Sequence, residues 1–284
     1  FPLALFVLIL KLFVLTQLTF SLRVSVYMSG FIRYCSILGA FFCFAVFYSA
    51  MVLAAPNIHF TDYRILLTEK QTTKNYQIFN QGDAPAYCYT GIIDHNVSSD
   101  GKLSLANKSN RPETSAADIV RISPRRVIVP AMANQKVKVV ARRFKQLNNG
   151  ERVSYLNLRC KEHNPKLTSG LNIQPNFIFN IPVVVRKGQL DVEAKMEQVR
   201  LNQIKGTYFA DVNIRRQGER SLFGNLFIYD EKGLLATKNG ISHYLQSTSI
   251  PLRVQLKQKP RGRVTVEFIE QEQFGGDIKL KHIL

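Results

Sequence analysis

The chain has 284 residues, of which 46% are hydrophobic and 20% are charged. This balance excludes a disordered chain and leaves room for one large domain or two of ordinary size. The formal net charge is +18, and such a surplus favours acidic partners such as nucleic acid, anionic membrane or carboxylate-bearing protein segments. The basic residues are spread through strand-like segments, however, so for most of them we expect a solvated basic surface.

Two apolar stretches, at roughly 1–20 and 31–54, open the chain. The second has the parts of a secretory signal, because Met28 and a basic residue precede its apolar run and small residues end it near Ala54. The pattern predicts a signal peptide at 28–54 with cleavage after Ala54, and hence export.

Met28 is a plausible start of translation, which makes residues 1–27 an over-extended reading frame and places the whole of 1–54 outside the mature protein. The alternative is a membrane span at 1–20, since about 18 apolar residues can cross a bilayer. A signal that begins at Met28 is complete by itself, so we favour the first interpretation. It leaves no stable membrane anchor after cleavage.

From Ala55 onward, short alternating segments are separated by turn residues, which is typical of an all-β sandwich. The segment 95–117 is rich in Asn, Ser, Asp and Lys and predicts a mobile surface loop. Around it lie seven candidate strands, the number that an immunoglobulin-like domain needs. These strands are 59–68, 73–81, 86–94, 119–129, 134–143, 152–161 and 171–186.

A second alternating series begins near Gln189 and continues to the end of the chain. In 207–214, for example, the side chains of Tyr208, Ala210 and Val212 share one face. We therefore expect two immunoglobulin-like β-sandwich domains, at 55–187 and 188–284. A short polar joint between them predicts a bent arrangement with a cleft.

The segment Leu171–Arg186 is unusual because every odd position in it is apolar. As one strand it would span about 50 Å, at about 3.3 Å per residue, which exceeds what one such domain covers. The row from Ile173 to Phe179 then either lacks an internal partner or packs in a large core, and the residues alone leave both interpretations open. Pro175 and Pro182 indicate an edge strand. An apolar edge strand is an aggregation hazard unless it serves a purpose such as joining a partner's sheet.

The order of several segments resembles the first domain of periplasmic chaperones that assemble pili, the chaperone–usher family. The segments are ISPRRVIVPAMANQKVKVVARR (122–143), NGERVSYLNLRC (149–160) and IPVVVRKG (181–188), and the run 62–94 is similar to that family's first three strands. The segment 213–233 is similar to second-domain segments of some members. The resemblance covers essentially all of 56–284, more weakly in the second domain.

The resemblance implies a periplasmic chaperone that stabilises pilus or fimbrial subunits by donor-strand complementation and delivers them to an outer-membrane usher. In that mechanism the chaperone supplies the strand that an incomplete subunit lacks. The side chains donated to the subunit would be Ile173, Pro175, Phe177 and Phe179. Neither a cofactor nor a catalytic residue is implied.

The resemblance also implies a basic anchor for the subunit's C-terminal carboxylate, and Arg64 matches it. A charge-assisted contact suits such a carboxylate. Without the resemblance, Arg64 would be interpreted as a solvated strand residue. The family's second anchor, a lysine, falls at Pro182, and this departure leaves Lys187 as a candidate substitute. Arg186 matches the family's interdomain arginine.

After removal of the signal, Cys88 and Cys160 are the two remaining cysteines, and an oxidising compartment favours one disulfide. In an immunoglobulin-like sandwich the third and sixth strands are antiparallel neighbours, which places Cys88 opposite Cys160. We therefore expect a Cys88–Cys160 disulfide. No metal site is expected, because Cys160 and His163 stand alone and a zinc site needs about four ligands.

An enzyme is not expected, since the sequence lacks G-x-S-x-G, H-E-x-x-H and a phosphate-binding loop. The run from Ser99 to Lys102 fits S-x-x-K, but it lies in the turn-rich loop. Nucleic-acid binding is also not expected, because aromatic residues are not interleaved with the basic ones. The remaining alternative is an exported immunoglobulin-like surface binding module, such as an adhesin or a pilus subunit with its own ligand.

Overall fold

The computed structural model describes residues 56–163 and 175–284. The predicted signal peptide and Ile173 lie outside these residues. The described chain consists of β-strands and two short 3₁₀ segments, Phe144–Gln146 and Glu272–Phe274. No helix within these two ranges is long and apolar enough to cross a membrane.

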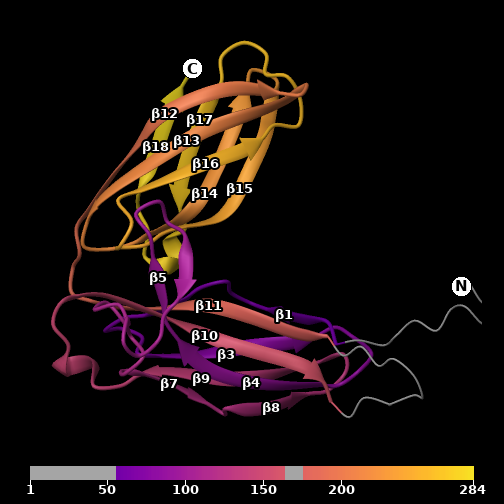
Figure 1. Ribbon diagram of the computed structural model, residues 1–284, viewed down its shortest axis with the longest axis vertical. Helices are drawn as coiled ribbons and strands as arrows, with labels where there is room; N and C mark the ends of the chain where they lie inside the picture. The colour runs from indigo at the N-terminus through magenta and orange to yellow at the C-terminus, as the bar shows by residue number, and fades with distance from the viewer. Residues whose placement is uncertain (1–55, 164–174) are drawn as a thin grey trace, which may run out of the picture. The chain divides into compact units, whose positions relative to one another are not determined.

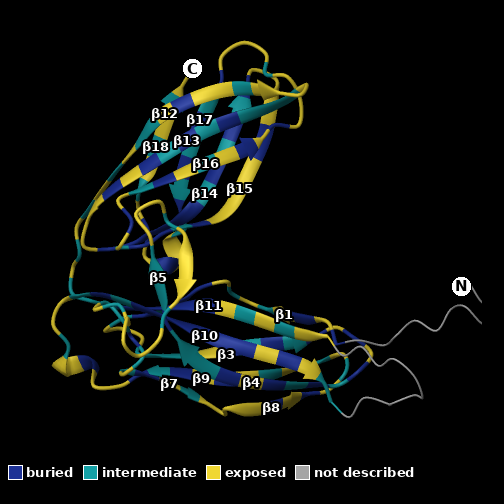
Figure 2. Cartoon of the chain, in the orientation of Figure 1, coloured by how far each residue is buried: buried dark blue, intermediate teal, exposed yellow. Residues whose placement is uncertain are grey.

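The first sandwich packs a four-stranded sheet of order β1-β3-β9-β7 against a five-stranded sheet of order β2-β11-β10-β4-β8 (Figure 1). Buried and exposed residues alternate along many of these strands, as a sandwich with one buried face per sheet requires (Figure 2). The core between the sheets includes Tyr76, Leu156 and Leu158. The strands are β1 (Ile58–Phe60), β2 (Ile65–Leu67), β3 (Thr73–Asn80), β4 (Ala86–Ile93), β7 (Val120–Ser123), β8 (Arg126–Val129), β9 (Ala133–Ala141), β10 (Gly150–Glu162) and β11 (Asn176–Lys187).

Two of the expected strands are each divided between the sheets. The segment 59–68 forms β1 in one sheet and β2 in the other, and 119–129 does the same as β7 and β8. Pro124 lies at the second division, where it supplies no backbone donor to a ladder. Across each division the inward apolar positions change from even to odd residue numbers, from Val120 and Ile122 to Val127 and Val129 in the second case, as a change of sheet requires.

The segment 95–117 contains regular structure, which corrects the expectation of a mobile loop. It holds a hairpin of β5 (His95–Val97) and β6 (Leu103–Leu105). The buried carboxylate of Asp94, at its base, accepts hydrogen bonds from the hydroxyls of Ser154 and Ser115 at 2.5 and 2.9 Å and pairs with Arg111 at 3.0 Å. This carboxylate ties both ends of the insertion to the first sandwich.

The second sandwich has sheets of order β12-β13-β16 and β15-β14-β17-β18 around its own core, which includes Ile228, Val266 and Phe268. Its strands are β12 (Val192–Ile204), β13 (Thr207–Gly218), β14 (Leu222–Asp230), β15 (Gly233–His243), β16 (Ser249–Gln255), β17 (Thr265–Glu270) and β18 (Lys279–Ile283). The predicted fold class, all-β with two immunoglobulin-like sandwiches, is confirmed.

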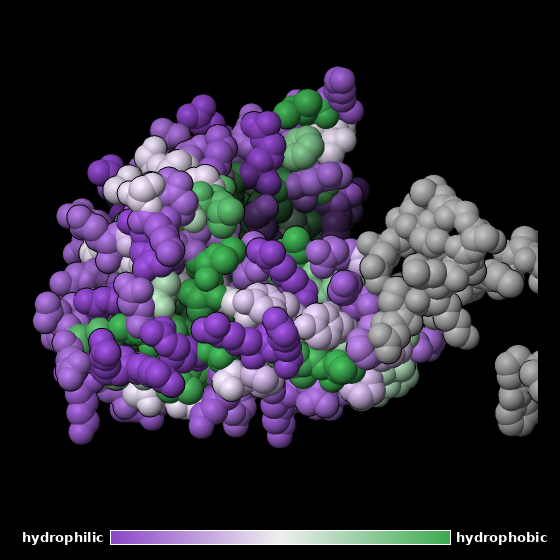
Figure 3. Space-filling model, turned by 60° about the horizontal axis from the view of Figure 1, so that its bottom comes forward, coloured by the Kyte–Doolittle hydropathy of each residue, from purple (hydrophilic) through white to green (hydrophobic). Residues whose placement is uncertain are grey.

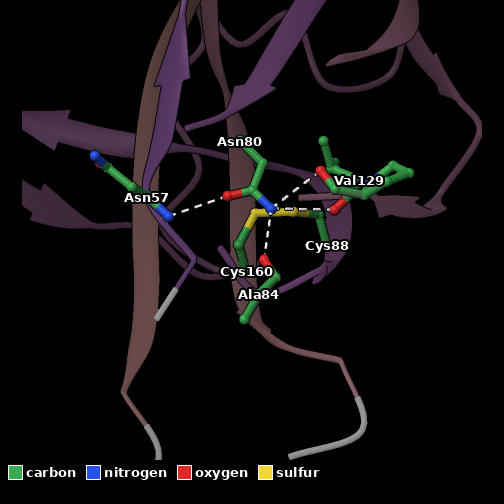
Figure 4. The surroundings of a disulfide bond; sticks show 7 residues. Asn57, Asn80, Ala84, Cys88, Val129 and Cys160 are labelled. Carbon is green, nitrogen blue, oxygen red and sulfur yellow. Dashed lines mark hydrogen bonds between the residues drawn. A yellow bond between two sulfur atoms is a disulfide. The ribbon is translucent and has the colours of Figure 1, made fainter. Parts of the chain in front are cut away.

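The predicted disulfide is also confirmed. Strands β4 and β10 are antiparallel neighbours in which Cys88 lies directly opposite Cys160, and their sulfur atoms are bonded at 2.09 Å. Beside the bridge, the Asn80 carboxamide accepts from the Asn57 N–H and donates to the carbonyls of Ala84 and Val129, at 3.1, 2.7 and 3.2 Å (Figure 4). These bonds connect several strands and turns at one end of the first sandwich.

Candidate functional site

One edge of strand β11 is largely unpaired. Along its inner edge, β11 pairs with β10 from Asn176 to Lys187. Along its outer edge, it pairs with β2 only from Val183 to Val185. Within the described ranges, the outer edge over 176–182 therefore has no strand partner, and its backbone groups are free to add another strand.

The apolar row of β11 faces the interior side of the sheet. Phe177 and Phe179 lie opposite Cys160 and Leu158, which are both in the core. Phe179 borders that core and contacts Phe60 edge to face, with ring centroids 4.9 Å apart. The interpretation that this row packs internally therefore holds in part for Phe179.

The other described members of the predicted donor row are less enclosed. Phe177 is half-buried and Pro175 is exposed. On the opposite face of the strand, Ile178 is 54% exposed. The free edge borders a cavity of about 370 Å³ lined by Ile58, His59, Phe60, Tyr63, Ile178, Phe179, Asn180 and Ile181.

Arg64 is buried, contrary to the simple expectation of a solvated residue. Its side chain is only 1% exposed. One terminal nitrogen donates to the Ser221 hydroxyl at 2.6 Å, and the guanidinium carbon lies 5.0 Å from the centre of the Phe223 ring. Burial lowers the pKa of this guanidinium, and the carboxylate of Glu151 opposes the shift.

Two nitrogens of Arg64, Nε and Nη1, have no hydrogen-bond partner in the described chain. A buried cationic donor without a partner is costly, and a carboxylate is the acceptor best matched to it. A cavity of about 470 Å³ adjoins this region, and its lining includes Tyr63, Pro182, Phe223 and Phe274. Arg64 itself does not line this cavity, which its neighbour Tyr63 and the underlying ring of Phe223 border.

The structure does not bring Lys187 to Arg64. The Lys187 ammonium donates to the backbone carbonyls of Lys145 and Leu147, at 2.9 and 2.5 Å. Pro182 lines the cavity near Arg64 but offers no charge. Of the two residues predicted as anchors, Lys187 is thus held elsewhere and Arg64 alone remains a candidate.

Arg186 does join the two sandwiches, and its acidic partner is Glu151. Its Nε and Nη2 atoms donate to Glu151 Oε2 at 3.0 and 2.7 Å, while Nη1 donates to the Gly275 carbonyl at 3.1 Å. The other oxygen of Glu151 accepts from the Ser221 N–H at 3.0 Å. Sequence reasoning missed Glu151, although it lies directly opposite Arg186 on β10; correct pairing of the two strands would have identified it.

The candidate pair Cys160 and His163 does not form a metal site. Cys160 is held in the disulfide, and the His163 ring stacks on Tyr87 with centroids 6.2 Å apart. Among the residues that the structure describes, no group of three or more His, Cys, Asp or Glu side chains could hold a metal ion.

No protein-family model matches the chain, and no curated protein matches it. Several solved structures are similar. The YadV chaperone has a TM-score of 0.44 and 14% identity, over 80% of this chain and 99% of that one. The CsuC–CsuE chaperone–tip adhesion subunit complex of Acinetobacter baumannii has a TM-score of 0.45 and 11% identity, over 79% and 98%. The complex of Salmonella enterica SafA pilin with the SafB chaperone has a TM-score of 0.44 and 9% identity, over 80% and 96%. At these values the similarity concerns the fold alone.

Proposed function

We propose that the protein is a periplasmic chaperone that binds an incomplete pilus or fimbrial subunit by lending it strand β11 and delivers it to an outer-membrane usher. The observation that carries this proposal is the unpaired outer edge of β11 over 176–182. A sandwich that lacks one strand offers free backbone groups and an open apolar groove. An edge strand with an apolar row can pair with those backbone groups and fill that groove with its side chains.

The donated side chains in this proposal are Ile173, Pro175, Phe177 and Phe179. Among the described members of this row, Phe177 would bury the most additional apolar surface on binding, because it is half-buried and has a large apolar ring. Full burial of a phenylalanine contributes about 1.5–3 kcal/mol, before the cost of ordering the complex. Phe179 would bury less additional surface, since its ring already contacts Phe60.

Arg64 is proposed to receive the subunit's terminal carboxylate. Its free Nε and Nη1 atoms are two donors that the folded chain leaves without acceptors. The cavity that Tyr63 and Phe223 line adjoins Arg64 without including it, so in this proposal the guanidinium turns toward the cavity when the carboxylate binds. The buried setting strengthens such a contact, because little water competes for the charge.

The strand-lending proposal is tested by replacing neighbouring residues on the two faces of β11. Each variant is co-expressed with a fibre subunit, and the periplasmic yield of that subunit is measured. We expect Phe177→Ser to lower the yield several-fold and the matched control Ile178→Ser to leave it near the wild-type value. Circular dichroism confirms that both variants are folded. Equal yields from the two variants would overturn the donor role and would favour a surface binding module.

The carboxylate anchor is tested separately by Arg64→Met, which keeps a long side chain and removes the charge. A folded variant with a several-fold lower subunit yield would support the anchor. An unchanged yield would refute the role of Arg64 and leave strand lending intact.

A further inference from the structure

A cavity of about 740 Å³ lies on the outward face of the three-stranded sheet of the second sandwich. Residues of β12, β13 and β16 line it, together with Ser99 and Asp100 in the turn of the β5–β6 hairpin. Its volume falls within the range of small-molecule sites, about 300–1,000 Å³. Neither Arg64 nor any residue of β11 lines this cavity, so it is separate from the site described above.

The lining of this cavity is mostly hydrophilic. On the face that Figure 3 turns forward, apolar residues lie in patches between hydrophilic ones. In the cavity, by contrast, the apolar lining residues are Val212, Pro251 and Leu252, and all the others carry side chains that donate or accept hydrogen bonds. A ligand that fits here must therefore be rich in hydrogen-bonding groups.

The charges of the lining cancel. The strand register places Asp211 between Arg200 and Arg253, and Asp100 is the fourth charged lining residue. Lys102 pairs with Asp100 at 2.7 Å, but its side chain is 84% exposed and does not line the cavity. The lining thus has no net charge, although the whole chain carries +18. An anion would meet two carboxylates there, so the lining favours a neutral ligand.

Hydrogen bonds within the cavity hold several of its polar groups in place. The Asp211 carboxylate accepts from Arg253 Nε and Nη2 at 2.6 and 2.9 Å and from Asn202 Nδ2 at 2.5 Å. Asn213 Oδ1 accepts from the Ser249 hydroxyl at 2.6 Å. Asn202 Oδ1 and Asn213 Nδ2 form no hydrogen bond with any residue that the structure describes, which leaves one acceptor and one donor for a ligand. Groups that are fixed before binding lose little entropy when the ligand arrives.

A β-bulge in β12 directs polar side chains to this face. The pairing of β12 with β13 shifts just before Arg200, and Gln198 has φ +52° there, in a region that side chains rarely adopt. Across the bulge the inward residues change from even to odd positions, from Met196 to Val199. Without the extra residue, Arg200 and Asn202 would face the core. Bulges that re-aim side chains, and strained backbone, are concentrated at functional sites.

Hydroxyl groups match this lining best, because each hydroxyl both donates and accepts a hydrogen bond. The carboxamides of Gln198, Asn202 and Asn213 likewise offer donors and an acceptor in one plane. The register also places the half-buried ring of Phe209 beside Asn202 on the same face of the sheet. A saccharide has hydroxyls around its edge and an apolar C–H face, so it can use both the carboxamides and the aromatic ring.

We propose that this cavity binds a neutral saccharide whose hydroxyl groups bond to Gln198, Asn202 and Asn213 and whose ring face packs on Phe209. The site involves neither strand β11 nor Arg64, so it stands or falls separately from the proposed function.

The test screens the mature chain against an array of neutral and acidic oligosaccharides and measures Kd for the neutral one that binds most tightly by isothermal titration calorimetry. We expect Asn202→Ala/Asn213→Ala to raise this Kd by about tenfold or more, because two hydrogen-bonding groups are lost. The matched control is Gln203→Ala/Gln217→Ala, which removes two exposed carboxamides from the same two strands outside the cavity and should change Kd by less than about twofold. Circular dichroism confirms that both variants are folded. Equal changes in Kd, or an array on which no neutral oligosaccharide binds, would overturn the proposal.

Two further measurements identify the ligand class. The Kd for the neutral oligosaccharide should change little up to about 0.5 M NaCl, because no ionic contact is screened. Phe209→Leu keeps an apolar side chain without the flat ring and should weaken binding several-fold. Loss of binding in salt, or an array that binds acidic oligosaccharides alone, would show attraction to net charge and refute the saccharide site. An unchanged Kd for Phe209→Leu would contradict the packing of the sugar ring on Phe209.

Discussion

Among single residues, His243 carries a pH-dependent part of the stability. It is fully buried, and its Nε2 lies 3.0 Å from the Ser247 carbonyl, which fits a neutral ring that donates from this nitrogen. Burial, together with the nearby charge of Arg216, lowers the pKa of His243 from 6.5 to about 4. Between these values the unfolded chain binds a proton that the folded chain does not, so folding stability falls as the pH is lowered from 6.5 to 4.

The loss of folding stability approaches 3 kcal/mol, because a pKa difference of one unit between the folded and unfolded chain corresponds to about 1.4 kcal/mol. We expect His243→Gln, which keeps a hydrogen-bond donor, to flatten this part of the stability profile. Urea unfolding of both proteins at several pH values between 4 and 7 measures the difference, and His59→Gln at an exposed position is the matched control. Parallel profiles for wild type and His243→Gln would contradict the prediction.

Some residue roles could be predicted from the sequence, and others could not be predicted from it. The Cys88–Cys160 bridge was predictable because strand order in this type of sandwich determines which cysteines meet. The burial of Arg64 was not, because the Ser221 hydroxyl that it contacts lies 157 residues away in the second sandwich. No local pattern reports a contact of that kind.

Among the elements, β11 was the most predictable, because its alternation continues without interruption. The divisions of 59–68 and 119–129 between sheets were missed, although the inward apolar residues change from even to odd positions between the two halves of each segment. The hairpin of β5 and β6 was also missed. Its strands have three residues each, too few for a period to be evident beside polar turn residues.

The tip of this hairpin packs on the second sandwich at Gly101, and this contact yields a prediction. A Cβ atom at Gly101 would lie 2.7 Å from Ile250 Cγ2, and the residue has φ +83°. Gly206 has a similar φ of +82°, but a Cβ there would meet nothing within 4 Å. Alanine at Gly206 should therefore cost only the backbone strain, about 1 kcal/mol. Alanine at Gly101 should cost a further 1–3 kcal/mol or so from overpacking. Thermal unfolding of the two variants measures this difference, and equal midpoints would show that the hairpin does not pack on Ile250.

On the scale of the whole molecule, buried polar groups connect the two sandwiches around the short joint. Ser221 accepts from Arg64 and donates to Glu151, and Arg186 links Glu151 to the Gly275 carbonyl. Farther along the interface, the Ser247 hydroxyl donates to the Ser99 carbonyl at 2.9 Å, and Tyr244 packs with Tyr155. The pair of Arg186 and Glu151 could be inferred from the pairing of β10 and β11, but the contacts to Ser221, Gly275, Ser247 and Tyr244 join residues of separate sandwiches and had no local signal.

Glu151 is the centre of this network, because it is the buried carboxylate that both Arg186 and Ser221 contact. Its side chain is fully buried and that of Arg186 is 10% exposed. Replacing Glu151 with Gln removes the negative charge and leaves the cations of Arg186 and Arg64 buried without it. Loss of one partner of a buried ion pair costs about 3–5 kcal/mol, so we expect Glu151→Gln to lower the unfolding midpoint strongly and to separate the transitions of the two sandwiches in calorimetry.

The matched control is Asp211→Asn. Asp211 also forms a two-bond pair with an arginine, Arg253, but 57% of the Arg253 side chain is exposed. Water and salt screen such a pair, so its loss should move the midpoint little. If the two variants shifted the midpoint equally, burial would not distinguish these ion pairs, and the Glu151 network could not be what joins the sandwiches. A large shift for Glu151→Gln alone would show that one carboxylate stabilises both the interface and the buried charge of Arg64, and hence that the proposed anchor depends on the contact between the domains.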